Sequence, residues 1–419
     1  MKVKVNSIIY MLLIMLILID TRLLYFNNVN QLLELSLAVL ALFFAFITSS
    51  KGKKSTLREF PYLRKVCVST IISFMIVYTY SLFKYHNQNL MGTFVGDSSH
   101  YKMLLIVLLA PLAKLCLDNG GTKWLFKMMN VFAALLYFLV AVQFVIYNLN
   151  KTVFLHAMSA GSDIPLLNGM LRISLSWIGN LMILYNFHMF YKDTKDKQTN
   201  KLKHFVLFAI GFVELIVISR VRGTTLAVTI GILVLIFADK STQKTMMKKM
   251  LIVVILLCGF FGTDIVSNFL DSFSLNATRA YSTTARLYAI DFYCSAFLKN
   301  PLFGIGFADG TVNAAVVHGD GRANVSDVGI FAQIAKYGIF ILPVYILPLI
   351  HSGKRIAIIW KMNYVENRQL YLALFMYILV SSISLVSIDH FRMLQWPIFL
   401  VTIEMAYWSS INRIKIEEV

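Results

Sequence analysis

The chain has 419 residues, of which 58% are hydrophobic and 14% are charged, and its mean hydropathy is +0.70. A soluble domain of this length needs far less apolar surface, so the composition excludes a soluble globular protein and predicts an integral membrane protein. The formal net charge is +18, but no clustered soluble basic patch accompanies it. We therefore expect no nucleic-acid partner and interpret the charge mainly as a signal of topology.

Apolar segments recur along the whole chain, each of roughly 17 to 24 residues and long enough to cross a bilayer. The first follows Lys2 and Lys4 as a signal peptide would, but it lacks a small-residue cleavage site, so we interpret it as a retained helix. We expect an all-α membrane protein with about twelve transmembrane helices in one polytopic domain, residues 1–419. The expected spans lie near residues 8–24, 31–48, 66–83, 101–117, 125–147, 170–190, 204–219, 224–238, 250–267, 327–350, 370–388 and 393–411.

Lysine and arginine set the orientation of these spans. The segments on the side of the N-terminus hold 25 of them and the opposite segments hold 12, so the positive-inside rule places both termini in the cytoplasm. Residues 268–326 then form one large external loop between the ninth and tenth helices. Of the four cysteines, only Cys294 falls in an external loop, so we expect no external disulfide.

The external loop contains a helix with a clear end. Thr283 or Thr284 is a suitable N-cap, and Asn300-Pro301 followed by Gly304 and Gly306 predicts a stop and a tight turn.

That helix carries one arginine on its apolar face. At 100° per residue, Arg286 shares a face with Ile290, Tyr293 and Phe297, while Asp291 lies on the opposite face. A buried guanidinium needs a partner, since an unpaired buried charge is strongly unfavourable. The partner is either a protein carboxylate or a bound anion.

Several common catalytic motifs are missing from the sequence. It has no G-x-x-x-x-G-K-[ST] loop for nucleotide phosphates, no Cys/His cluster with metal-ligand spacing and no Asp-x-Asp pair. We expect neither a cofactor nor a metal, and energy must come from the substrate or from a gradient.

Arginines gather on the external side, against the usual bias. Arg220 and Arg222 lie between two spans beside Gly223, Arg172 lies near the start of the sixth span, and Arg279 lies in the large loop. One interpretation is interfacial snorkelling. The other is an anion-binding cluster that includes Arg286, because a planar guanidinium matches phosphate oxygens in a bidentate way.

Carboxylates and histidines at the outer face are candidates for proton transfer: His318, Asp320, Asp327, Asp389 and His390. Asp327 has two interpretations, because it follows Ser326 at a helix start and either caps that helix or acts as a base. His318 precedes Gly319 in a loop and is either a surface residue or a second base. Two intramembrane carboxylates, Glu214 and Glu404, should face the bundle interior, where they could pair with Arg220 or Lys336.

Together these motifs resemble the O-antigen polymerase and O-antigen ligase family. The resemblance covers about residues 205–345. It rests on Arg222-Gly223 with Leu226 at an outer junction, on Arg286 before the N-P-L-F-G-x-G motif of residues 300–306, and on a helix that ends near Gly338. Many members have a histidine where this chain has Asp327.

The resemblance implies a metal-independent membrane glycosyltransferase of the bacterial cytoplasmic membrane. Its donor would be an oligosaccharide on undecaprenyl diphosphate, with Arg172, Arg220, Arg222, Arg279 and Arg286 on the diphosphate and Asp327 or His318 as the base. The product would be a capsule, exopolysaccharide or O-antigen polymer, and partners would include a flippase and a chain-length regulator.

Two alternatives stay open at the sequence level. A ligase would pass the glycan to a different acceptor by the same chemistry. A flippase or secondary transporter would also have about twelve spans, but such proteins usually show two similar halves, and the large external loop has no counterpart in the first half of the chain.

Overall fold

The computed structural model shows a bundle of helices, as expected. Apart from helices, its described part contains one antiparallel pair of two-residue strands, β1 (Leu166–Leu167) and β2 (Met170–Leu171). The structure describes residues 5–21, 23, 30–50, 60–94, 100–153, 166–167, 170–173, 175–192, 198–238, 280–325, 328–362, 365, 367–388, 392 and 394–417.

The α-helices fall into an N-terminal and a C-terminal series. The first series is α1 (Val5–Asp20), α2 (Asn30–Ser50), α4 (Pro61–Lys84), α5 (Leu90–Phe94), α6 (Leu109–Asp118), α7 (Thr122–Asn150), α8 (Trp177–Tyr191), α9 (Gln198–Glu214) and α10 (Arg222–Phe237). The second is α13 (Ala280–Lys299), α14 (Ala314–His318), α15 (Gly329–Tyr337), α16 (Leu347–Lys361), α17 (Arg368–Ser381) and α18 (Gln395–Glu417). Short 3-10 or π-helical turns are η2 (His100–Leu108), η3 (Leu215–Ser219), η6 (Gly338–Phe340) and η7 (Leu342–Ile346).

Within the described residues, five helical stretches are long and apolar enough to cross a membrane: Pro61–Lys84, His100–Asp118, Thr122–Asn150, Lys201–Ser219 and Leu342–Lys361. Shorter apolar helices cover Val5–Asp20, Leu33–Ile47, Gly223–Phe237 and Arg368–Ser381. The all-helical membrane fold is therefore confirmed. The number of twelve spans stays a prediction, and the expected span at residues 250–267 lies outside the described residues.

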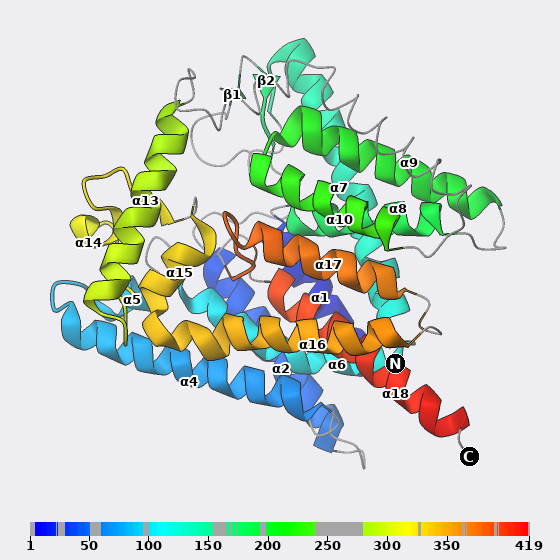
Figure 1. Ribbon diagram of the computed structural model, residues 1–419, viewed down its shortest axis with the longest axis horizontal. Coiled ribbons are helices and arrows are strands. Elements are labelled where there is room, and N and C mark those ends of the chain that lie inside the picture. Colours follow the sequence, from blue (N-terminus) through cyan, green and yellow to red (C-terminus); the bar gives the residue numbers. More distant parts are fainter. Residues whose placement is uncertain are drawn as a thin grey trace.

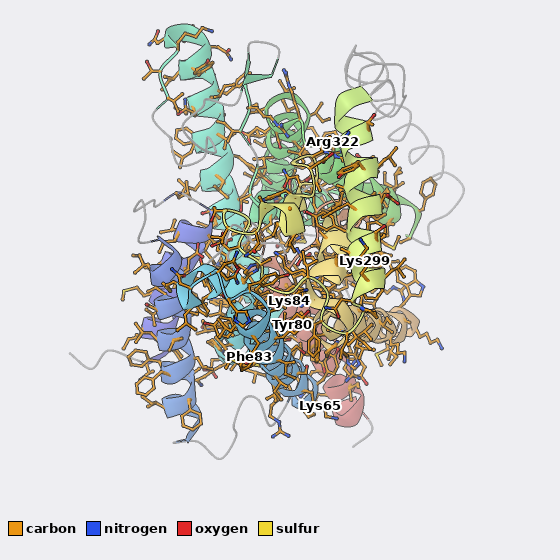
Figure 2. All side chains as sticks on the ribbon, turned by 90° about the vertical axis from the view of Figure 1, so that its left-hand side faces the viewer. Lys65, Tyr80, Phe83, Lys84, Lys299 and Arg322 are labelled. Atoms are coloured by element: carbon orange, nitrogen blue, oxygen red, sulfur yellow. The ribbon has the colours of Figure 1, made fainter. Side chains whose placement is uncertain are left out.

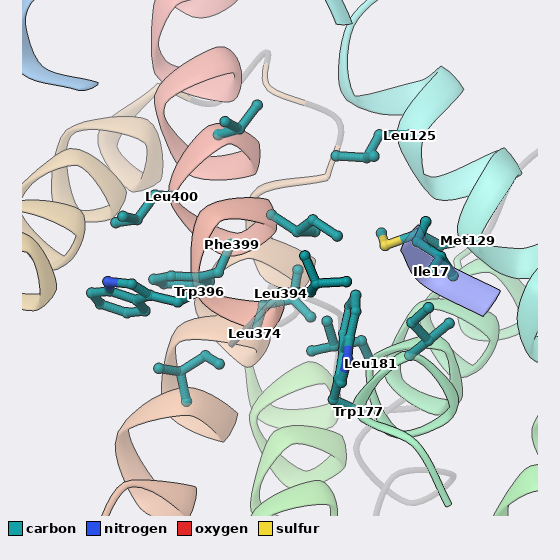
Figure 3. Close-up of a cluster of buried hydrophobic side chains, with 14 of the residues drawn as sticks. Ile17, Leu125, Met129, Trp177, Leu181, Leu374, Leu394, Trp396, Phe399 and Leu400 are labelled. Atoms are coloured by element: carbon teal, nitrogen blue, oxygen red, sulfur yellow. The ribbon is translucent and has the colours of Figure 1, made fainter. Parts of the chain in front are cut away.

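Apolar side chains from distant parts of the sequence form the core of the bundle. Figure 3 shows Trp177 of α8 and Trp396 of α18 among leucines, with Ile17 of α1 beside Met129 of α7. All four are almost fully buried. The N-terminal and C-terminal helices thus share one core, which ties the ends of α1, α7 and α8 to the last two helices.

Several of the long helices run in similar directions, and α13 runs across them. In Figure 1, α4, α16 and α17 run along the long axis of the molecule, and α13 crosses them at one end of the bundle. The start of α1 and the end of α18 lie at the opposite end. The chain therefore places α13, α14 and α15 together at one end, which we call the α13 end.

The tenth expected span differs from the structure. A single helix over residues 327–350 is wrong, because α15 ends at Tyr337 and the long apolar helix covers Leu342–Lys361. The break is at Gly338, which has φ +56°. A side chain there would collide with the carbonyl of Leu302, so the turn requires glycine.

The predicted helix of the large loop exists, but it begins earlier than expected. It starts at Ala280, so neither Thr283 nor Thr284 is its N-cap, and it ends at Lys299, before Asn300-Pro301, as predicted. Its buried face is also as predicted: Tyr293 is fully buried and Asp291 is exposed.

Candidate functional site

The junction between α9 and α10 has an unusual backbone. After Glu214 the helix widens into the π-helical turn η3, and Arg220 then takes a left-handed conformation with φ +52°. A non-glycine residue with positive φ is uncommon and carries a strain of roughly 1 to 3 kcal/mol. Single π-helical turns frequently occur at functional sites. The strained conformation of Arg220 and the π-helical turn before it make this junction a candidate functional site.

Two of the predicted arginines meet at this junction. The Nε of Arg220 donates to the carbonyl of Val217 at 2.7 Å, and the Nε of Arg172 donates to the carbonyl of Ser219 at 3.2 Å. The last carbonyls of a helix carry partial negative charge, so they hold both guanidiniums well. Arg222 is the first residue of α10, two residues further along. The structure thus brings Arg172, Arg220 and the backbone of Arg222 together.

The segment that follows α17 connects this junction to the start of α15. A side chain added at Gly223 would meet the side chain of Ser384, and one added at Gly329 would meet the carbonyl of Ser382. Ile330 donates its backbone N–H to that same carbonyl at 2.9 Å. The beginnings of α10 and α15 therefore contact the same short segment from two sides.

Four sequence-predicted site residues lie outside the described residues. Asp327 belongs two positions before Gly329, the first residue of α15, and Arg279 one position before Ala280, the first residue of α13. The other two are Asp389 and His390. Their roles stay predictions from the sequence.

Arg286 lies on α13, which packs against α15. Its side chain is partly buried, and its Nε is shielded from solvent and has no hydrogen-bond partner among the described residues. An unsatisfied charged donor of this kind is unfavourable unless a ligand completes it. Within the described part of the chain, no carboxylate lies within ion-pairing distance of Arg286.

The N-P-L-F-G-x-G motif fastens α13 to the end of α15. Ile305 and Gly306 donate their backbone N–H groups to the carbonyls of Ala335 and Lys336, at 2.8 and 3.0 Å. In the other direction, Ile339 donates to the carbonyl of Pro301 at 2.9 Å. We call these three hydrogen bonds the α13–α15 bracket.

Glycine is required at two positions of this motif. Gly304 and Gly306 have φ +63° and +72°. At Gly304 a Cβ would lie 2.8 Å from the carbonyl carbon of Ala335 and closer still to its oxygen. The predicted structural role of Asn300, Pro301, Gly304 and Gly306 therefore agrees with their positions.

The same motif is also bound to the end of α4, a contact that the sequence did not predict. Asn300 donates its Nδ2 to the hydroxyl of Tyr80 at 2.6 Å, and the backbone N–H of Phe307 donates to Ser81 Oγ at 2.8 Å. Gln88 donates to the carbonyl of Phe307 at 2.9 Å. These residues are more than 200 positions apart, and no periodicity within either segment indicates such pairing.

His318 is more ordered than its loop position suggested. It is the last residue of α14, is half-buried, and its Nδ1 lies 3.1 Å from the carbonyl of Ala323. This contact requires the proton on Nδ1, because a carbonyl only accepts. Whether His318 is a surface residue or a second base stays a prediction.

Asp320 is held by the neighbouring Arg322. The Nε of Arg322 donates to Asp320 Oδ2 at 2.7 Å, and the guanidinium lies 4.5 Å above the ring of Tyr288 on α13. The hydrogen bonds from Arg322 lower the pKa of the exposed Asp320 carboxyl to about 2. A carboxylate this acidic is a poor base at neutral pH, so Asp320 is the weaker candidate for proton transfer.

The two intramembrane carboxylates face the interior, as predicted, but their partners differ from those expected. Glu404 pairs with Arg355 at 3.2 Å and lies 3.7 Å from His351. Glu214 is 3% exposed, and neither of its carboxylate oxygens has a hydrogen-bond partner in the described part of the chain. Pairing with Arg220 or Lys336 is therefore wrong for both.

Taken together, these observations define an all-helical membrane protein in which Arg172 and Arg220 meet at the junction of α9 and α10. Residues 206–333 match the family model described as O-antigen ligase. The resemblance found in the sequence is thus confirmed: over this stretch the chain is similar to the O-antigen polymerase and ligase family. A comparison with curated proteins gave no match. The matched stretch contains the junction of α9 and α10, α13 with Arg286, and most of α15.

Proposed function

We propose that the protein is a membrane glycosyltransferase that polymerises oligosaccharide repeat units carried on undecaprenyl diphosphate. The product is a surface polysaccharide, and the α13 end of the bundle faces away from the cytoplasm. Two observations carry this proposal. The guanidiniums of Arg172 and Arg220 meet just before the start of α10, and Arg286, whose Nε has no partner among the described residues, lies on α13, which packs against α15.

The arginines suit a diphosphate leaving group. Glycosyl transfer breaks the bond between the anomeric carbon and a diphosphate oxygen, and the electron pair leaves with the diphosphate. Donors that are already in place stabilise this developing charge without reorganisation. Arg172 and Arg220 are held by helix carbonyls, so they are fixed before substrate arrives. The Nε of Arg286, which has no partner among the described residues, gains one when the anion binds.

The acceptor hydroxyl forms the new bond to the anomeric carbon from the opposite face, with inversion, and its proton passes to a base. Asp327 is our first candidate, because in the sequence it stands two positions before Gly329, the first residue of α15. His318 is the second, with its Nδ1 directed at the carbonyl of Ala323. A positioned base typically contributes about 10² to 10⁴ in rate.

Ligation to a different acceptor is the alternative that the family match supports equally. The diphosphate chemistry is the same in both reactions, and only the acceptor differs. A polymerase accepts a second lipid-linked repeat unit, whereas a ligase accepts a glycan on another carrier.

The test is transfer by the purified protein in proteoliposomes that contain a lipid-linked oligosaccharide. Arg286→Lys should reduce turnover by about a hundredfold, because lysine keeps the charge but loses the bidentate fork. The matched control is Arg322→Lys, since Arg322 lies in the same external region but is already paired with Asp320. Equal turnover of Arg286→Lys and wild type would refute the diphosphate role.

A further inference from the structure

A polymerase handles two lipid diphosphates at once, one on the donor and one on the acceptor. Beyond the arginine site, the described residues contain a second cationic surface at the α13 end. Lys84 ends α4 and Lys299 ends α13, and both are exposed. Neither has a carboxylate within ion-pairing distance among the described residues. Figure 2 shows Lys84 beside Tyr80, with Lys299 higher up on α13 at the same end of the bundle, which faces the viewer.

Aromatic rings connect Lys84 to the segment that follows Lys299. The Nζ of Lys84 lies 5.2 Å from the ring centroid of Tyr80 and 5.3 Å from that of Tyr85. Tyr80 in turn stacks on Phe303 of the N-P-L-F-G motif at 4.3 Å. Asn300, the neighbour of Lys299, donates to the Tyr80 hydroxyl. The lysines are thus held at one surface by contacts between two segments that are distant in sequence.

The surface below the lysines is apolar and exposed. Phe83, Leu298 and Leu302 are 72%, 75% and 50% exposed. Large apolar side chains next to lysine and tyrosine are typical of the boundary between the hydrocarbon and the headgroups of a membrane. An amphiphile with an apolar chain and a strongly anionic head matches this arrangement, since the chain covers the apolar residues and the head meets the two ammonium groups.

We propose that this surface, defined by Tyr80, Phe83, Lys84, Leu298, Lys299 and Leu302, binds the polyprenyl diphosphate of the acceptor repeat unit. The inference rests on the proposed function. Lys299 and Arg286 are both on α13, about 20 Å apart along the helix at 1.5 Å per residue. The two diphosphates therefore have separate sites, and the oligosaccharide of the acceptor spans the distance between them. A ligase, whose acceptor has no such carrier, does not need the second site.

The binding test uses a photoreactive polyprenyl diphosphate without sugar, added to the full-length protein in nanodiscs. We expect labelling of the peptides around Lys84 and Lys299, and loss of that labelling in Lys84→Gln/Lys299→Gln. Lys65→Gln is the matched control, because Lys65 is an exposed lysine on the other end of the same helix. Excess phosphatidylglycerol should not compete. Equal competition by this lipid would make the surface an ordinary headgroup contact and overturn the proposal.

The kinetic test measures KM for the lipid-linked acceptor. Removal of both lysines should raise this KM roughly thirtyfold, since each basic residue at a membrane surface contributes roughly fivefold to binding of anionic lipid. The kcat should change little, because the arginine site is intact. An unchanged KM would refute the acceptor role alone. Absence of turnover in wild type, together with labelling at neither site, would instead refute the proposed transferase.

Discussion

The α13–α15 bracket yields a prediction whose size follows from the structure. In Gly304→Ala, the new Cβ would collide with the carbonyl of Ala335, so the N-P-L-F-G motif must move away from α15. The displacement disrupts the hydrogen bonds of Ile305 and Gly306 to the end of α15, each of which contributes about 1 kcal/mol. The left-handed backbone adds about 1 to 2 kcal/mol for a residue with a Cβ. Together, the two lost hydrogen bonds and the backbone cost should lower the free energy of unfolding by about 3 to 4 kcal/mol.

The control for this change is Gly321→Ala. Gly321 has φ +90°, and nothing lies within 4 Å of an added Cβ. Gly321→Ala therefore measures only the free-energy cost of placing a residue with a Cβ in the left-handed backbone conformation, which is about 1 to 2 kcal/mol. Thermal unfolding of both variants in the same detergent, followed by transfer activity, measures the difference. If Gly304→Ala unfolds at the same temperature as Gly321→Ala, the bracket contributes nothing to stability and the reasoning is refuted.

Two further predictions concern topology and the base. Cys294 is exposed, whereas Cys67 is partly buried within α4 and Cys116 is buried. A membrane-impermeant maleimide added to intact cells should therefore label Cys294 and neither Cys67 nor Cys116. Labelling of Cys67 from outside would reverse the proposed orientation. Asp327→Asn should accumulate lipid-linked repeat units without polymer, because Asn caps a helix about as well as Asp but is not basic. His318→Ala should retain partial activity, and turnover by the Asn variant within about threefold of wild type would make Asp327 a cap.

The sequence predicted local features of the site well, because they depend on neighbouring residues. The end of α13 before Asn300-Pro301, the buried face with Tyr293 and the position of Arg286 follow from helical periodicity and proline chemistry. The special backbone around Gly304 also follows, since repeated glycines in a short loop indicate positive φ. These inferences needed no knowledge of the tertiary fold.

Features that depend on distant contacts were missed. The break at Gly338 divides an apolar run that looks continuous, because it is determined by the Leu302 carbonyl lying against it. The attachment of the motif to Tyr80 and Gln88 likewise joins segments that share no local pattern. Glu404 pairs with Arg355 rather than with the expected residues, since helix neighbours in the bundle decide the partner of a buried charge.

The attachment of α13 also bears on transport as an alternative activity. Alternating access requires one part of a bundle to rock against another around a site near the midplane. Here the segment after α13 is hydrogen-bonded both to α4, through Tyr80 and Ser81, and to the end of α15. Three separate parts of the chain are thus fixed to one another at the same end. Such a fixed arrangement suits group transfer instead, because catalytic arginines stabilise a transition state only if they are already in place when charge develops.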